Sequence, residues 1–200
     1  MNVGVQYMRL RDYDKALLYF REALVIFKHL YGDNHPLIGS VSYNKAIVCF
    51  NLGRYEEAAD AYLTAFELYA ESMGEDHPHT FDAGNGACDA LAAGGNFRQA
   101  AEIKTKILNI QTAVLGNSHP LAVQTLYNLA RIEAGGEMIA EALEHYALAA
   151  ERAVEAFGAE SNNTQIITKQ YLSFKDLVEG NDKENEEKGE ENQEEENKEE

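Results

Sequence analysis

The sequence predicts an all-α fold in which helical hairpins stack in tandem as a solenoid, and an internal repeat is the first observation behind it. The segment Gly32-Asp33-Asn34-His35-Pro36 returns as Gly74-Glu75-Asp76-His77-Pro78 and as Gly116-Asn117-Ser118-His119-Pro120, each time after 42 residues. A fourth copy at Gly158 keeps the glycine and has lost the His-Pro pair. A period of this length is typical of repeat architectures.

The second observation is an apolar stripe that recurs at the same offset. The aligned sets are Tyr13, Tyr55, Phe97 and Ile139; Ala16, Ala58, Ala100 and Ala142; Phe20, Tyr62, Lys104 and Tyr146; and Ala23, Ala65, Ile107 and Ala149. Steps of three and four residues place these side chains on one face of a helix. The small residues let a second helix pack closely against that face.

This stripe predicts one helix of each repeat, which we call helix B, and a glycine ends it. We expect helix B at about 12–31, 54–73, 96–115 and 138–157. Gly32, Gly74, Gly116 and Gly158 then follow. A left-handed residue after the last turn closes many helices, and glycine adopts that conformation at little cost.

A proline predicts the start of the other helix, helix A. Pro36, Pro78 and Pro120 suit the first helical position, where a backbone N–H has no intrahelical partner. We expect helix A at about 36–51, 78–93 and 120–134, each ended by glycine. Every repeat is then an αα-hairpin. A single hairpin cannot bury its apolar face alone, so hairpins in tandem stack on one another.

These elements predict a division of the chain into an array and a tail. The array comprises a half-repeat at 1–31, repeats at 32–73, 74–115 and 116–157, and a capping helix within 158–178. The chain opens inside a helix A, since Met1 aligns with Tyr43, so it is either a fragment of a longer array or a half-repeat without a cap. Exposed apolar residues such as Val3 favour the fragment. Residues 179–200 contain nothing apolar and are predicted to be a disordered acidic tail.

Charge and composition narrow the classes of function. The net charge is −17, but the tail holds 12 acidic residues and three lysines, which leaves −8 for residues 1–178. A moderately acidic body argues against binding to nucleic acid or anionic lipid. Two cysteines, Cys49 and Cys88, are expected to be reduced core thiols, and no apolar run approaches the ~20 residues of a membrane span. The expected location is cytoplasmic.

No catalytic residue, metal site or cofactor is predicted. His35, His77 and His119 lie one repeat apart, and neighbouring helix axes are roughly 8 to 10 Å apart. Zinc needs its nitrogen ligands at about 2.0 to 2.1 Å, so these histidines cannot share one ion. We expect them to bond the local backbone between repeats. The many carboxylates lie on solvated helix faces, where nothing separates their pKa values for acid–base chemistry.

The repeat resembles the tetratricopeptide repeat. The segment Leu52-Gly53-Arg54-Tyr55-Glu56-Glu57-Ala58 resembles that family's turn between helices, and the series Ala58, Tyr62 and Ala65 resembles its B-helix signature. The ordinary period of the family is 34 residues. The longer period with Gly-x-x-His-Pro is similar to the kinesin light chain type of array, which also occurs in nephrocystin-like and clustered-mitochondria proteins.

This resemblance implies a site on the A helices. In such arrays these helices line a concave face that holds a peptide of a partner protein, and asparagines grip the peptide backbone. The amide of asparagine suits this role because it both donates and accepts hydrogen bonds. The A helices lack the set of lysines and asparagines with which co-chaperone repeats bind a terminal carboxylate, which argues against binding to a chaperone tail. The candidate peptide-binding residues are Tyr43, Asn44, Ile47, Asn85, Asp89, Tyr127, Asn128 and Arg131.

The leading hypothesis is therefore a non-enzymatic module that binds a protein or peptide partner in the groove. An alternative is a structural spacer or oligomerisation element of a larger array, joined through the exposed N-terminal half-repeat. A third hypothesis, from the clustered-mitochondria resemblance, is association with RNA complexes, and the net charge of −8 argues against direct RNA contact.

Overall fold

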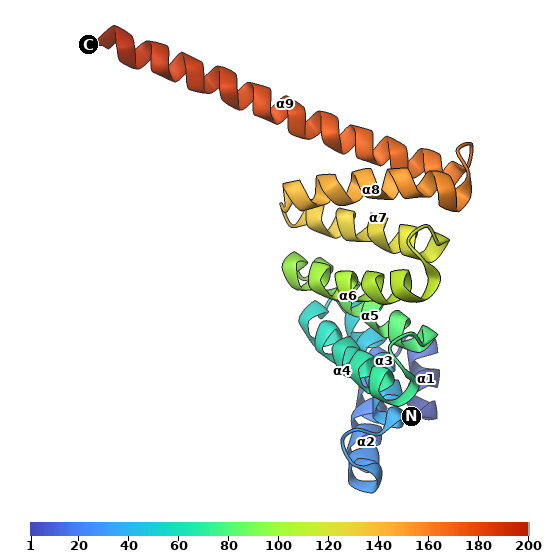
Figure 1. Ribbon diagram of the computed structural model, residues 1–200. Helices are drawn as coiled ribbons and strands as arrows, with labels where there is room; N and C mark the ends of the chain where they lie inside the picture. Colours follow the sequence, from blue (N-terminus) through green and yellow to red (C-terminus); the bar gives the residue numbers. More distant parts are fainter. Residues whose placement is uncertain (200) are drawn as a thin grey trace.

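The computed structural model describes residues 1–199, with side chains to Gly180, and shows a stack of helices. Figure 1 shows the helices following one another along the stack in sequence order. They are α1 (Asn2–Arg9), α2 (Tyr13–Tyr31), α3 (Pro36–Asn51), α4 (Tyr55–Met73), α5 (Pro78–Ala93), α6 (Phe97–Leu115), α7 (Pro120–Gly135), α8 (Ile139–Phe157) and α9 (Asn162–Glu199). The predicted all-α class is confirmed, and helices α2 to α8 begin and end within one residue of the expected positions.

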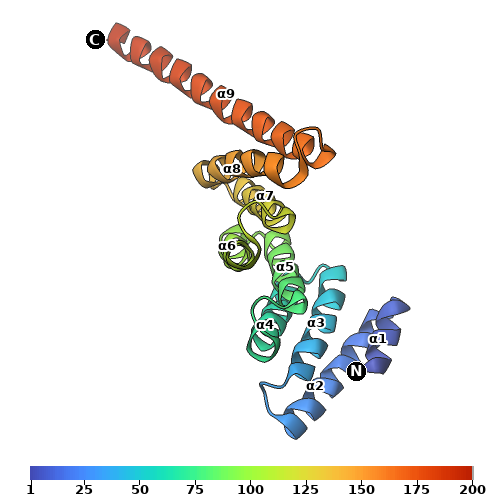
Figure 2. The same ribbon diagram turned by 45° about the vertical axis from the view of Figure 1, so that its right-hand side comes forward.

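Consecutive helices pack against one another as hairpins, which is the arrangement predicted for the solenoid. Figure 2 shows helices α3 and α5 on one side of the stack and helices α4 and α6 on the other. The two kinds of helix therefore form two layers. Buried alanines line the contact between the layers, and Ala16, Ala58, Ala100 and Ala142 of the sequence stripe are all fully buried. Their small side chains bring the helices close together.

The repeated glycines end the B helices, but in a conformation different from the predicted one. Gly32 has φ 83° and ψ 174°, and Gly116 has φ 92° and ψ 160°. The φ values are positive as expected, whereas the ψ values lie far from those of the left-handed helix. This region of backbone space is open essentially to glycine alone. The chain therefore leaves helix B extended, and the glycine is required more strictly than a left-handed cap would require it.

The histidine of each His-Pro pair caps the helix that follows. His35 Nδ1 accepts a hydrogen bond from the N–H of Leu37 (3.2 Å), and His119 Nδ1 accepts one from the N–H of Leu121 (3.2 Å). His77 makes the same contact in the repeat between them. These N–H groups lack partners within the helix, so the histidine acts as the N-cap residue, a role that serine or aspartate has in many other helices. The predicted local backbone role of these histidines is confirmed.

The last helix covers the end of the stack and extends beyond the predicted capping segment. Thr164 and Ile167 of α9 are buried against α8, and Thr164 Oγ1 donates a hydrogen bond to the Gly158 carbonyl (2.7 Å). Figure 1 shows the rest of α9 running out past the end of α8. The predicted disordered tail, residues 179–200, lies outside the residues with described side chains except for Glu179 and Gly180, and it stays a prediction.

Candidate functional site

The candidate residues lie on helices α3, α5 and α7, and five of the eight line two separate cavities. A cavity of about 440 Å³ lies between α3, α4 and α5, and we call it the tyrosine cavity. Its lining residues are Pro36, Ser40, Tyr43, Asn44, Tyr69, Met73, His79 and Asp82. A cavity of about 330 Å³ lies between α5, α6 and α7, and we call it the lysine cavity. Its lining residues are Asp89, Ala92, Phe97, Lys104, Asn128, Arg131 and Ile132.

The tyrosine cavity combines aromatic faces with hydroxyl and amide groups. The Tyr43 ring packs edge to face against Tyr62, with the ring centres 5.5 Å apart. Tyr69 donates a hydrogen bond from its hydroxyl to Ser40 Oγ (3.3 Å). Burial raises the pKa of Tyr43 and that of Tyr69, so both hydroxyls stay protonated at neutral pH and can donate a hydrogen bond.

Asn44 is partly engaged by its own helix. Its side-chain Nδ2 donates to the carbonyl of Ser40 (2.7 Å), which leaves the Oδ1 acceptor and one N–H for other partners. The side chain is half-buried. This bond holds the amide in one orientation, so a ligand would meet an ordered donor and acceptor.

The lysine cavity is built around a cation that the sequence interpretation assigned to the apolar stripe. Lys104 is 4% exposed, and its Nζ donates to Asn85 Oδ1 (2.7 Å). Arg131 on α7 lies over the Tyr127 ring, 5.9 Å from its centre. Asp89 is the acidic residue among the lining side chains, and it is exposed. The cavity therefore carries two positive groups, one negative group and the amide of Asn128.

Three candidate residues line neither cavity. Ile47 packs partly buried against the hydrophobic core, and Asn85 accepts the hydrogen bond from Lys104. Tyr127 packs against Tyr146, with ring centres 5.9 Å apart. The role of these residues in ligand contact stays a prediction, as it does for the five that line cavities.

Sequence reasoning missed the contribution of the B helices to this face. Tyr69 on α4 and Lys104 on α6 reach between the A helices and line the cavities. A signal for Lys104 was present, because the aligned positions in the other repeats hold Phe20, Tyr62 and Tyr146. A single charged residue in a set of aromatic residues indicates a position where the environment differs.

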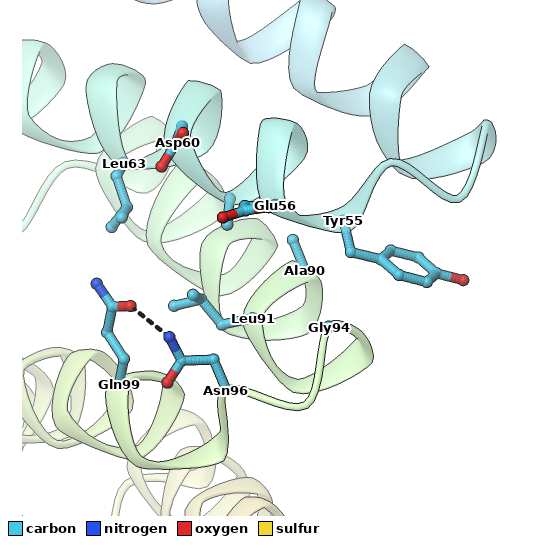
Figure 3. Close-up of a pocket in the computed structure, with 10 residues that line it drawn as sticks. Tyr55, Glu56, Asp60, Leu63, Ala90, Leu91, Gly94, Asn96 and Gln99 are labelled. Atoms are coloured by element: carbon cyan, nitrogen blue, oxygen red, sulfur yellow. Dashed lines mark hydrogen bonds between the residues drawn. The ribbon is translucent and has the colours of Figure 1, made fainter.

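A third cavity, of about 360 Å³, opens on another part of the stack. Figure 3 shows Glu56, Asp60 and Leu63 of α4 facing Asn96 and Gln99 across Leu91 and Ala90 of α5. Asn96 Nδ2 donates to Gln99 Oε1 (2.9 Å). None of the eight candidate residues lines this cavity. Glu56 and Asp60 are exposed, so no burial separates the roles of the two carboxylates as an acid–base pair would require.

The two cysteines are buried and contribute to the packing of the core. Burial raises the pKa of the Cys88 thiol to about 11, and Cys49 is also buried with a raised pKa. Both are unpaired thiols, in agreement with the prediction of reduced core residues.

Glu133 on α7 and His145 on α8 form an ion pair. Among residues 1–180, no three His, Cys, Asp or Glu side chains lie together as metal ligands would.

The searched part of the chain also contains no helix that is both long and apolar enough to cross a membrane.

Comparisons with known proteins agree with this arrangement of helices. The family model described as tetratricopeptide repeat matches residues 1–71 and 37–103. A Clustered mitochondria protein homolog of Meyerozyma guilliermondii is 26% identical over 154 residues, which is 77% of this chain and 12% of the relative. Protein KINESIN LIGHT CHAIN-RELATED 3 of Arabidopsis thaliana is 26% identical over 110 residues, which is 54% of this chain and 17% of the relative. The chain thus spans a small part of the length of both.

A solved structure extends the agreement in fold over most of the chain. Kinesin light chain-like, nearly identical TPR-like repeats from Podosopora anserina superimpose with a TM-score of 0.66 at 17% identity, covering 89% of each chain. At this identity the match shows the fold alone. Repeats of this family typically bind other proteins and are non-catalytic. Since the family model covers residues 1–103 of 200 and the helical hairpins continue beyond them in the same order, the chain belongs to the tetratricopeptide repeat family.

Proposed function

We propose that this protein is a non-enzymatic interaction module that holds an extended segment of a partner protein across helices α3, α5 and α7. The observation that supports the proposal is the pair of cavities that the A helices line in successive repeats, one between α3 and α5 and the other between α5 and α7. The tyrosine cavity and the lysine cavity share helix α5, through Asp82 in the first and Asp89 in the second. Asp82 and Asp89 are seven residues, or about 10 Å, apart along helix α5. An extended chain of a few residues would span that length, because each of its residues covers about 3.3 Å.

The polar groups of the two cavities suit the backbone of an extended segment. Asn44 and Asn128 occupy neighbouring cavities, and each offers an amide that can pair with a peptide group of any sequence. The Tyr43 and Tyr69 rings supply apolar contact area with a hydroxyl at the edge. The mixed lining supports recognition by a few directed hydrogen bonds together with apolar contacts.

The test is selection of peptides from a random dodecapeptide library on the immobilised full chain, followed by titration of the best binder. The Asn44→Ala and Asn128→Ala variants should each weaken binding by about 1 kcal/mol, or about fivefold in Kd. Asn109→Ala is the matched control, since Asn109 is an exposed residue on helix α6 that lines neither cavity. Equal binding by all three variants would refute the assignment to this face.

A second candidate function is self-association, or docking within a larger array, through the first hairpin. Helix α2 exposes Leu18 and Val25 at 49% and 65%. The aligned positions are acidic or polar in the later repeats: Asp60, Glu102 and Glu144, and Glu67, Asn109 and Glu151. Apolar groups that replace charged ones on an exposed helix favour a contact with a second copy of the chain.

Sedimentation of the full chain against its Val25→Glu variant tests this second candidate. A mass that falls to that of the monomer in the variant supports self-association. A parent chain that is monomeric at all concentrations leaves the groove as the function. The third hypothesis, association with RNA, stays a prediction from the family resemblance, and the acidic body argues against direct contact.

A further inference from the structure

The lysine cavity exists because one repeat has a lysine where the others have an aromatic residue. The aligned residues Phe20, Tyr62 and Tyr146 are all buried, and Lys104 takes their place on helix α6. In the preceding repeat the Tyr62 ring lies directly against Gly86, where an added Cβ would come within 2.6 Å of Cε1. The aromatic ring therefore fills the space between two successive A helices in that repeat.

The corresponding space one repeat later is open. Lys104 stands in for Tyr62, and Asn128 stands in for Gly86. The lysine side chain is slender and turns to Asn85, so no ring occupies the gap and a cavity of about 330 Å³ remains. In the last repeat Tyr146 closes the gap again by packing against Tyr127 and Phe174.

The ammonium group of Lys104, which lines this cavity, has few partners for a buried cation. The residue is 4% exposed, and its ammonium group has three N–H donors, of which one bonds to the neutral Asn85 amide. Within residues 1–180, Lys104 forms no salt bridge. A buried charge is costly unless it is paired and hydrogen-bonded. An anion that entered the cavity would supply the missing acceptors.

The other polar side chains that line the lysine cavity also favour an anionic ligand. Arg131 lines the same cavity and presents a guanidinium that binds carboxylates with two parallel hydrogen bonds. Asn128 adds an amide donor. Asp89 opposes these groups, but it is exposed and solvated, so its repulsion is weaker than the attraction of the buried ammonium.

We propose that the lysine cavity is a subsite for the carboxylate of an aspartate or glutamate side chain within the bound segment. The proposal rests on the proposed function, since the acidic side chain belongs to the peptide held across helices α3, α5 and α7. The carboxylate accepts hydrogen bonds from Lys104 Nζ and from the Arg131 guanidinium. We assign a side chain rather than a chain terminus because the tyrosine cavity lies to one side of the subsite and the half-buried Tyr127 of helix α7 lies to the other, so the segment can extend in both directions.

The experiment uses the full chain and the dodecapeptides selected on it. Aligned binders should share an acidic residue at one interior position, and replacing that glutamate by glutamine in the best peptide should weaken its binding at least about tenfold. Lys104→Met should weaken the glutamate peptide to a similar extent and remove the difference between the two peptides. Arg131→Gln, at an exposed position that folding tolerates, should reduce the difference as well.

Matched controls separate the subsite from general electrostatics. Lys106→Met removes one charge from an exposed position on the same helix and should preserve the preference for glutamate. Amidation of the peptide's C-terminus should leave the affinity unchanged. Binders without a shared acidic position, a preference that survives Lys104→Met, or binding that is lost on amidation would each overturn the subsite while leaving the groove in place. A selection that yields no binder overturns the proposed function, and the subsite with it.

Discussion

The contact between Glu133 and His145 predicts a pH-dependent contribution to the stability of the last hairpin. Glu133 is buried on helix α7, with its side chain 6% exposed, and one of its carboxylate oxygens accepts a hydrogen bond from His145 Nδ1 on helix α8 (2.7 Å). The aligned residues in the preceding repeat are Leu91 and Ile103, which both belong to the hydrophobic core. An ion pair thus replaces an apolar contact at this position.

The pair raises the pKa of His145 above its ordinary value of 6.5. The largest cause is the hydrogen bond to Glu133, burial opposes it, and the charges of Glu133, Glu144 and Glu141 reinforce it. Because the pKa is higher in the folded state, the stabilisation is fully present below the unfolded pKa and is lost as the pH rises through the folded pKa. The free energy of unfolding should therefore fall with increasing pH from near 6.5 upward on account of this group.

The magnitude follows from the kind of bond and its burial. A hydrogen bond to a charged group contributes about 1.5 to 3 kcal/mol, and removing one partner of a buried pair costs more because the other partner stays buried. Glu133→Leu should therefore destabilise the protein by about 2 kcal/mol at pH 6, which is roughly 4 to 8 °C in Tm for a chain of this size. The double variant with Glu133→Leu and His145→Ile restores an apolar contact and should recover most of the loss.

The assay is thermal unfolding by circular dichroism of the parent, both single variants and the double variant, between about pH 5 and pH 9. The coupling energy from this cycle isolates the pair from all other titrating groups. It should be largest at the acidic end and decline through the folded pKa of His145. A coupling energy that is near zero, or that does not change with pH, would refute the reasoning.

Three further outcomes test the structural roles of single residues. Gly86→Ala should destabilise the array by about 1 to 3 kcal/mol, because the new Cβ meets the Tyr62 ring at 2.6 Å, and chemical denaturation measures the change. His119→Ala should cost about 1 kcal/mol through loss of the cap on helix α7, seen as faster hydrogen exchange in its first turn, whereas His29→Ala at an exposed position should change nothing. Cys88, whose thiol has a pKa of about 11, should resist a thiol reagent at pH 8 until urea is added, and rapid labelling of the native protein would contradict its burial.

Local signals in the sequence determined the helices and their order. Proline and histidine begin an A helix, and glycine ends a B helix, through contacts that span at most four residues. Such contacts need no knowledge of the rest of the fold, so the ends of helices α2 to α8 agree with prediction to within one residue. The 42-residue period determined the stacking because each hairpin must bury its apolar face against the next.

The candidate site depended on side chains that meet across repeats. The asparagines and Arg131 could be placed on the A helices from the pattern, but Lys104 could not be distinguished from a residue that merely interrupts the apolar stripe. It lines a cavity because no ring like that of Tyr62 fills the space and because its ammonium group bonds to Asn85 on another helix. Whether a space between helices is filled or open is decided by the volumes and rotamers of residues from several elements together. The sequence by itself therefore determined the solenoid, and only the tertiary structure decided which repeat carries an open, cationic cavity.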